Sequence, residues 1–163
     1  MVRRAAEADA GAIAALSGQL GYPTTEAAVR ARLEAALRRS DNEVLVAEHA
    51  GVVVGWLHVY GVHTLESDAH AEIAGLVVDE HRRSRGIGEA LLADAETWAA
   101  QAGYRDARVR SNVIRQRAHR FYVRQGYAEK KRQAVLVKNL PDPRTLGPSD
   151  LRTLGPSHPR TST

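Results

Sequence analysis

The chain has 163 residues, of which 44% are hydrophobic and 26% charged, and this is ordinary for a soluble protein of one globular domain. Cysteine is absent, which excludes disulfides, thiolate metal sites and a cysteine nucleophile, and no apolar run reaches the roughly 20 residues of a membrane span. The net charge of +4 is dispersed and aromatic residues make up 5%, which argues against nucleic-acid binding. Because the first residues also lack the apolar segment of a signal peptide, we expect a cytoplasmic protein with no membrane partner.

Taken in chain order, apolar spacing and turn residues predict a mixed α/β architecture. Strands are predicted at 2–4, 43–48, 52–60, 71–78, 107–111, 127–129 and 133–138. Helices are predicted after Asp9, which we expect to be the N-cap, from Thr24 or Thr25 to about residue 40, from Ile87 to Gly103, and from Arg115 to Gln125. The order gives a mixed sheet of six to seven strands flanked by four helices, with the strands at 71–78 and 107–111 parallel.

The composition changes after residue 140. Residues 141–163 hold five of the six prolines and contain R-T-L-G-P-S twice. Such a segment has too few apolar residues to form a core of its own. We therefore expect a folded domain at 1–140 and a flexible tail at 141–163, with a docking segment as the alternative for the tail.

The stretch from Leu76 to Leu92 predicts an anion-binding turn between a strand and a helix. Gly86 and Gly88 allow a tight turn with free N–H groups, and the helix dipole and three nearby arginines add positive charge. The Walker spacing and the third glycine of a dinucleotide fingerprint are both missing. What remains is R-x-x-G-x-G, from Arg83 to Gly88, which favours a pyrophosphate; a glycine-containing turn with a solvated basic rim is the alternative.

This pattern resembles motif A of the GNAT superfamily of acetyl-CoA-dependent N-acetyltransferases. A later stretch, S-N-V-I-R-Q-R-A-H-R-F-Y-V-R-Q-G-Y at 111–127, resembles the second GNAT signature, and the resemblance covers about residues 1–140. It implies a GNAT-like fold in which the parallel strands splay apart after a bulge in the strand ending at Val78. Acetyl-CoA would enter that gap as co-substrate, and the chemistry of the family needs no metal.

The resemblance also implies which residues contact acetyl-CoA. Strand backbone would pair with the pantetheine amides, N–H groups of the turn would hold the pyrophosphate, and the second signature would line the cofactor arm. The implied contacts are Leu76, Val77, Val78, Arg83, Ser84, Arg85, Gly86, Ile87, Gly88, Glu89, Asn112, Ala118, His119 and Tyr122. For His119, a surface position is the alternative.

Direct attack of an amine on a thioester needs an acid and a base. Tyr122 matches the family's Tyr and is the candidate acid, because a phenol and a thiol have similar pKa values; a core aromatic is the alternative. Glu72 is the candidate base, since alternation places it on the same face as Leu76 and Val78 and family members carry a Glu there. A Glu in solvent or paired with an Arg is the alternative.

The strings at 71–78 and 118–127 look most like those of small-amine members such as aminoalkylphosphonate and aminoglycoside N-acetyltransferases. We expect the connections at 21–23 and 61–70 to bind the acceptor, and their acidic residues favour a cationic amine such as a polyamine or an aminoglycoside. The residues they offer are Tyr22, His63, Glu66, Asp68 and His70. A metal site within 61–70 is a weaker reading, because polar loops collect such residues routinely.

The leading hypothesis is therefore an acetyl-CoA-dependent N-acetyltransferase acting on a small primary amine. Two alternatives stay open: an enzyme that acetylates proteins or peptides, and a non-catalytic sensor that binds acyl-CoA. Family members are often dimers, so a homodimer is possible.

Overall fold

In residues 1–142, five strands form one sheet with the order β1-β2-β3-β4-β5. They are β1 (Val2–Arg4), β2 (Asn42–His49), β3 (Val52–Val62), β4 (His70–Val78) and β5 (Ala107–Val109). The first four are antiparallel to their neighbours, and β5 runs parallel to β4. The predicted mixed sheet and its one parallel pair are confirmed, with fewer strands than expected.

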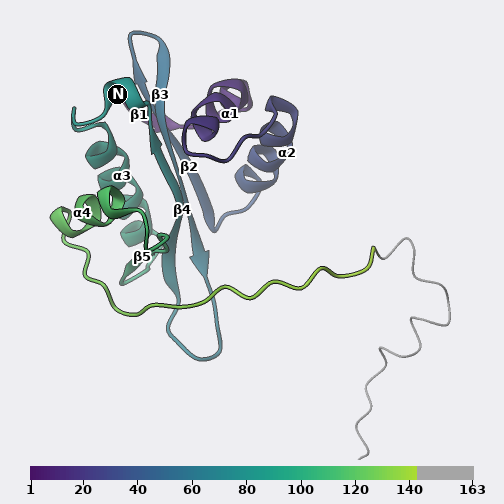
Figure 1. Cartoon of the computed structure of the whole chain (residues 1–163), viewed down its shortest axis with the longest axis vertical. Helices are drawn as coiled ribbons and strands as arrows, with labels where there is room; N and C mark the ends of the chain where they lie inside the picture. The colour runs from purple at the N-terminus through teal and green to yellow at the C-terminus, as the bar shows by residue number, and fades with distance from the viewer. Residues whose placement is uncertain (143–163) are drawn as a thin grey trace, which may run out of the picture. The chain divides into compact units, whose positions relative to one another are not determined.

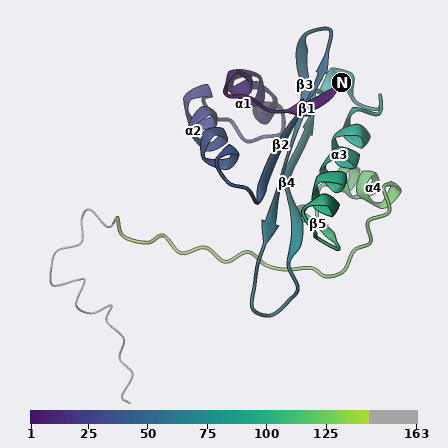
Figure 2. The ribbon, with the colours of Figure 1, turned by 180° about the vertical axis from the view of Figure 1, so that it is seen from behind.

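The computed structural model describes residues 1–142, in which Met1–Tyr127 form one compact unit and the chain from Ala128 on belongs to a second. Four α-helices accompany the sheet: α1 (Ala10–Gln19), α2 (Glu26–Leu37), α3 (Ile87–Gln101) and α4 (Gln116–Arg124). Helices α1 and α2 cover one face of the sheet, and α3 and α4 lie on the other (Figure 1), as the view from behind also shows (Figure 2). None of the helices in residues 1–142 is long and apolar enough to cross a membrane.

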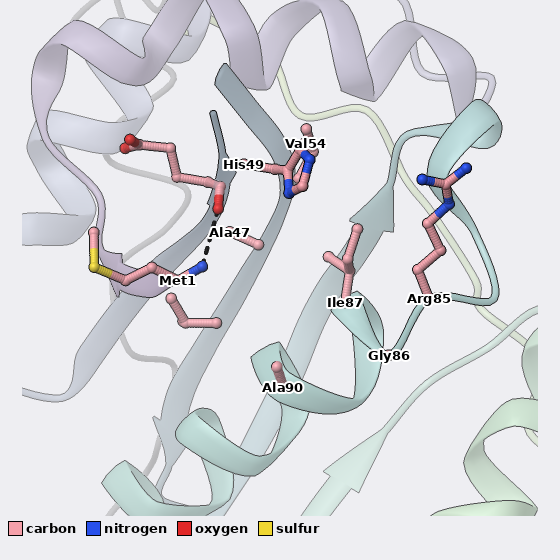
Figure 3. Close-up of a pocket in the computed structure, with 10 residues that line it drawn as sticks. Met1, Ala47, His49, Val54, Arg85, Gly86, Ile87 and Ala90 are labelled. Carbon is pink, nitrogen blue, oxygen red and sulfur yellow. Dashed lines mark hydrogen bonds between the residues drawn. The ribbon is translucent and has the colours of Figure 1, made fainter. Parts of the chain in front are cut away.

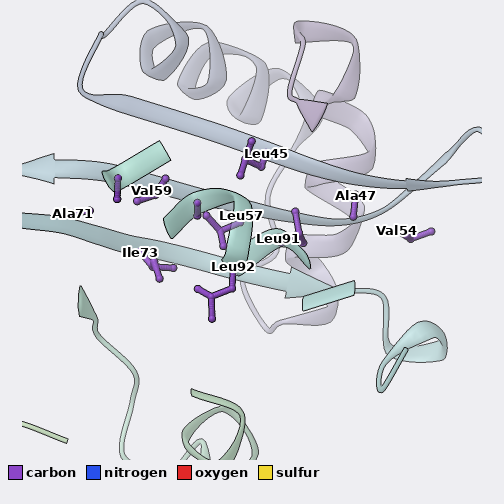
Figure 4. Packing of buried hydrophobic residues seen from close by; sticks show 11 residues of the cluster. Leu45, Ala47, Val54, Leu57, Val59, Ala71, Ile73, Leu91 and Leu92 are labelled. Atoms are coloured by element: carbon purple, nitrogen blue, oxygen red, sulfur yellow. The ribbon is translucent and has the colours of Figure 1, made fainter. Parts of the chain in front are cut away.

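The larger core lies between the sheet and α3 (Figure 4). Leu57 of β3, Ile73 of β4 and Leu91 and Leu92 of α3 are each at most 2% exposed. Burying a side chain of this size contributes about 1.5–3 kcal/mol. A second cluster on the other face packs Val44 and Val46 of β2 against α1 and α2. The two clusters hold the sheet between two helical layers and so fix the position of its β4–β5 edge.

Helix starts follow local side-chain chemistry in one case and not in the other. Thr25 caps α2 as predicted, because its Oγ1 accepts a hydrogen bond from the N–H of Ala28 at 3.2 Å. Asp9 stands at the N-cap position of α1 but makes no capping hydrogen bond there. Its carboxylate instead accepts hydrogen bonds from the N–H of Ala6 and from both terminal nitrogens of Arg3. These partners occupy the oxygens that would otherwise cap the helix.

The strands predicted at 127–129 and 133–138 are wrong as secondary structure, because residues 128–142 form neither helix nor strand. Val135, Leu136 and Val137 of this segment are 83–93% exposed. Their apolar side chains, two of them β-branched, favour a strand. A strand also needs a neighbour for its backbone hydrogen bonds, and none of the five strands in residues 1–142 supplies one. The tail predicted at 141–163 lies, apart from its first two residues, outside the described residues.

Candidate functional site

The two neighbours of β4 pair with different lengths of it. β3 pairs with β4 from His70 to Val78, whereas β5 pairs only with Ala71–Ile73. From Ala74 on, the edge of β4 that faces β5 therefore has no strand partner in residues 1–142. The register with β3 shifts at the same place, where Ala74 is left without an opposite residue. The strand thus carries the predicted bulge and, after it, a row of backbone groups free to bind an extended ligand that carries amides.

The bulge also changes which side chains share a face. Ile73 before it and Leu76 after it both pack in the α3-side core, although Leu76 is three positions after Ile73 and simple alternation would place them on opposite faces. Glu72 lies directly opposite Tyr60 of β3, a neighbour of Val59, which is itself in the α3-side core. Glu72 therefore faces the α1–α2 side. The prediction that Glu72 shares the face of Leu76 and Val78 is wrong, because alternation does not continue through an inserted residue.

The free edge of β4 leads into the glycine turn. Gly86 is the N-cap of α3 with φ 76°, a conformation that glycine adopts at little cost. The first-turn N–H groups of α3, at Ile87, Gly88 and Glu89, have no acceptor within their helix and none elsewhere in residues 1–142. Ser84 also has a positive φ, of 63°, which strains a residue with a side chain. The turn is thus a nest of N–H donors at the positive end of a helix dipole, as an anion requires.

Arginine side chains of this turn behave differently from one another. Arg83 folds back, and its Nε donates to the carbonyl oxygen of Val78 at 3.3 Å. Arg85 is exposed and has no hydrogen bond or ion pair with other groups of residues 1–142. Arg83 therefore helps to shape the turn, while Arg85 is free to meet a charged ligand.

Helix α4 packs on the first turn of α3 through Phe121. A Cβ built at Gly88 would lie 3.4 Å from the ring of Phe121 and 3.6 Å from the side chain of Leu76. The three residues therefore meet at this point. The next residue, Tyr122, makes edge contacts with the rings of Phe121 and Tyr127 at centroid distances of 5.1 and 5.5 Å. The two predicted signatures are thereby brought together, with the start of α3, β4 and α4 in mutual contact.

Tyr122 is the predicted acid. Its hydroxyl has no hydrogen-bond partner in residues 1–142, whereas the hydroxyl of Tyr127 donates to Oε1 of Glu96 at 2.9 Å. Burial raises the pKa of Tyr122 to about 12. The phenol therefore keeps its proton at neutral pH and has it available for a leaving group, although it is a weaker acid than an unperturbed phenol.

Two further predicted contacts of acetyl-CoA lie on α4, and a third precedes this helix. Ala118 lies one turn before Tyr122 and His119 three residues before it, and both are half-buried. Asn112 is exposed, and its Oδ1 accepts from the N–H of Ile114 at 3.1 Å, so it shapes the connection between β5 and α4. Ala118 and His119 thus lie on the helix that carries Tyr122, Asn112 lies in the connection before it, and their contact with acetyl-CoA stays a prediction.

Glu72, the predicted base, is 5% exposed. The hydroxyl of Tyr60 donates to its Oε1 at 3.2 Å, and Nε of Arg110 lies 3.1 Å from its Oε2. Burial and the negative charge of Glu72 raise the pKa of Tyr60. Both carboxylate oxygens are therefore engaged. Glu72 is paired with an Arg, which was the alternative to a role as base.

His58, which was not among the residues predicted from the sequence, lies on the same face as Tyr60. Its Nε2 is 2.9 Å from Oδ1 of Asn42, and the side-chain amide of Asn42 donates to Oδ1 of Asp41 at 2.9 Å. Burial lowers the pKa of His58. The signal was present in the strand at 52–60, where Trp56, His58 and Tyr60 alternate with apolar residues.

The two predicted acceptor connections lie apart along the sheet. Tyr22, between α1 and α2, is covered by the guanidinium of Arg115, which lies 5.4 Å from its ring centroid and donates to the carbonyl of Leu20. This connection therefore touches the one between β5 and α4. The 61–70 connection reaches the other end of α3, since Nε2 of His63 is 3.5 Å from the hydroxyl of Tyr104. Its remaining predicted residues differ in exposure: Glu66 and Asp68 are exposed, and His70 is 4% exposed.

Two further features of the described chain bear on ligands. A pocket of about 180 Å³ lies between the start of α3 and strands β1–β3, with Met1, His49, Arg85 and Gly86 in its wall (Figure 3). It includes no residue of β4, β5 or α4, so it is separate from the free edge of β4. In residues 1–142, no three or more His, Asp or Glu side chains are grouped so as to hold a metal ion.

Known proteins resemble this chain in sequence and in fold. A model of the acetyltransferase (GNAT) family matches residues 12–127. An aminoalkylphosphonate N-acetyltransferase of Salmonella typhimurium (strain LT2) is 40% identical over 80 residues, which are 48% of this chain and 52% of that protein. The match thus spans about half the length of that relative. The uncharacterized N-acetyltransferase YhfO of Bacillus subtilis (strain 168) is 29% identical over 133 residues, 78% of this chain and 89% of that protein.

Among solved structures, an aminoglycoside N-acetyltransferase in complex with CoA superposes with a TM-score of 0.75 at 19% identity. The superposition covers 86% of this chain and 100% of that one. At this identity the likeness concerns the fold.

Proposed function

The chain belongs to the GNAT family of acetyltransferases, and from that membership we propose that it transfers the acetyl group of acetyl-CoA to a primary amine of a small molecule. One observation carries the proposal. The unpaired edge of β4 from Ala74 to Val78 continues into the Gly86 turn, whose N–H groups are free, and Tyr122 lies beside both through Phe121. Enzymes of this family use acetyl-CoA, and the groups along this path match its parts in order.

The chain's own residues would act at separate places along that path. Backbone groups of Leu76–Val78 would pair with the amides of the pantetheine arm, and the N–H groups of α3 would hold the pyrophosphate with Arg85 beside them. Acetyl-CoA supplies an activated acyl group, so an amine can attack it without a covalent enzyme intermediate. The hydroxyl of Tyr122, which is free and protonated, would donate a proton to the departing thiolate.

The acceptor is proposed to enter from the α1–α2 face. Glu72, Tyr60 and Arg110 line that face at the end of the β4–β5 ladder. A buried carboxylate there attracts a protonated amine, which supports a cationic acceptor and keeps Glu72 as a candidate base. The exposed guanidinium of Arg110 would equally suit an acidic group on the acceptor, as the named activity of the Salmonella relative requires.

An acceptor panel tests the proposal. The protein is incubated with acetyl-CoA and each of a polyamine, an aminoglycoside, an aminoalkylphosphonate and a lysine-containing peptide, and thiol release is followed. We expect thiol release with at least one small amine and little with the peptide. Release with the peptide alone would favour a protein acetyltransferase, and binding of acetyl-CoA without any release would favour a sensor.

A further inference from the structure

A chain of side-chain contacts fixes the protonation pattern of His58. Nε and one terminal nitrogen of Arg39 bind the two carboxylate oxygens of Asp41, at 3.0 and 2.7 Å. Oδ1 of Asp41 accepts from Nδ2 of Asn42, so the amide of Asn42 must turn its oxygen toward His58. An amide oxygen only accepts, and Nε2 of His58 therefore carries the proton. Nδ1 is left with its lone pair and has no partner in residues 1–142.

The position of His58 relates this free nitrogen to the bulge. His58 lies directly opposite Gly75 of β4, and the register shift of the β3–β4 ladder falls between His58 and Val59. Gly75 has no side chain, and the ring of Trp56 lies over it, 2.8 Å from where a Cβ would be. The histidine thus stands beside the point where the free edge of β4 begins.

The same face carries the acceptor-side groups. The His58 ring is 5.7 Å from the ring of Tyr60, whose hydroxyl binds Glu72. Glu72 already accepts from Tyr60 and Arg110, while Nδ1 of His58 accepts from nothing in the described chain. Of the two candidate proton acceptors on this face, Nδ1 of His58 has no hydrogen-bond partner in residues 1–142, whereas each oxygen of Glu72 already accepts one hydrogen bond.

We propose that His58 is a general base of the acetyl transfer, with Nδ1 accepting the proton of the attacking amine. This inference rests on the proposed acetyltransferase function. The amine nitrogen forms a bond to the acetyl carbon while the carbon–sulfur bond breaks with its electron pair on sulfur. One proton passes from nitrogen to Nδ1 of His58, and the thiolate takes its proton from Tyr122. The lowered pKa of His58 keeps the imidazole neutral, and so able to accept a proton, at physiological pH.

The first variant is His58→Gln, which keeps an amide donor for Asn42 and removes the base. With wild type turning over, we expect kcat to fall about 100-fold and the KM for acetyl-CoA to stay within about twofold. His49→Gln, at the exposed end of β2, is the matched control and should keep wild-type turnover. If wild type itself transfers no acetyl group, the proposed function fails; if only His58→Gln equals wild type, the base assignment fails alone.

A pH profile separates a base from a residue that only supports the fold. At saturating acceptor, wild-type kcat should fall toward acidic pH as His58 becomes protonated. Because burial lowers the pKa of His58, this acid limb should lie below that of an ordinary histidine, and it should be missing in His58→Gln. The charged or titratable groups of the network around it are Tyr60 on β3, Glu72 on β4, Arg110 after β5, and Asp41 with Arg39 before β2. A lower rate that keeps the acid limb would overturn the proposal.

Asn42→Asp provides a second test that does not remove the histidine. A carboxylate facing Nε2 stabilises the imidazolium, so it should move the acid limb of wild type to higher pH. This variant decides the matter if His58→Gln does not fold. An acid limb that stays in place in Asn42→Asp would show that His58 does not titrate in the reaction.

Discussion

Glu72, a paired residue of β4, and Arg110, one residue beyond β5, form an ion pair beside the end of the β4–β5 ladder. The carboxylate side chain is 7% exposed and the guanidinium 72% exposed, with Nε 3.1 Å from Oε2. The last paired residues of the two strands are Ile73 and Val109. The ion pair therefore ties the residue that follows β5 back to β4, next to the point where the free edge of β4 begins.

Replacing Glu72 by Gln should affect both stability and acceptor binding. The amide keeps one oxygen for Nε of Arg110 but removes the negative charge, so the free energy of unfolding should fall by about 1–2 kcal/mol, because a hydrogen bond to a charged group is stronger than one to a neutral amide. The KM for a cationic acceptor should rise, while acetyl-CoA affinity stays unchanged. Denaturant unfolding and steady-state kinetics measure these effects.

Glu34→Gln serves as the control for that substitution. Glu34 pairs with Arg38 on the surface of α2, and both side chains are exposed, so a change below about 0.5 kcal/mol is expected. Equal destabilisation by the two variants would show that the Glu72–Arg110 pair has no special part in the structure.

Tyr122→Phe removes the only group that we assign to the departing thiolate. Turnover should fall about 100-fold with unchanged affinity for acetyl-CoA by calorimetry, because the ring and its packing are kept. Tyr127→Phe loses the hydrogen bond to Glu96 and should retain turnover. A Tyr122→Phe enzyme as fast as wild type would remove this residue from the mechanism.

The raised pKa of Tyr122 gives that assignment a pH dependence. The acid is active while protonated and is lost only as the pH rises through about 12. The ratio of wild-type to Tyr122→Phe turnover should therefore stay constant between pH 7 and 10. A ratio that collapses toward one below pH 10 would contradict the assignment.

Gly86→Glu places a negative charge beside the free N–H groups of α3 and should abolish CoA binding. Part of its effect is strain, since φ is 76° at this position and a residue with a side chain pays about 1 kcal/mol there. Gly103→Glu is the matched control, because Gly103 has φ 88° and open space around it but lies at the end of α3. Calorimetric titration with CoA should find binding in Gly103→Glu and none in Gly86→Glu.

Asp9 predicts how stability depends on pH. Its hydrogen bonds with Arg3, which outweigh the opposing effect of burial, lower the pKa of the Asp9 carboxyl below 3.8. A lowered folded-state pKa stabilises the protein above about pH 4 and ceases to do so as the pH falls through the folded value. Asp9→Asn should thus reduce the unfolding free energy by about 1–3 kcal/mol at pH 7. The difference from wild type should shrink in denaturant titrations toward pH 3; a constant difference would contradict the linkage.

Features encoded by neighbouring residues were predictable from the sequence. The turn at 83–88, the helix after it and the hairpin around 49–51 depend on local glycine and apolar patterns, and the structure has all three. The resemblance to one family also implied that the helix at 115–125 lines the same cofactor as the turn, and α4 does contact the start of α3. That these residues bind acetyl-CoA stays a prediction.

Features that depend on pairing across the sheet were not predictable from the sequence. The bulge that turns Glu72 to the other face arises from the register with β3, and alternation along β4 alone gives the opposite face. The partners of Glu72 and His58 are 38 and 16 residues away from them in sequence. The apolar residues at 135–137 form a strand only with a partner, which the local pattern does not report.

The most direct measurement compares two quantities in one reaction, thiol released from acetyl-CoA and primary amine lost from the acceptor. With wild-type protein and a small amine, we expect the thiol released and the amine lost to rise together in a one-to-one ratio. With Gly86→Glu, we expect no thiol release and no loss of amine. Thiol release that is independent of the amine, or equal reaction in Gly86→Glu, would contradict acetyl transfer at the β4 edge and the Gly86 turn.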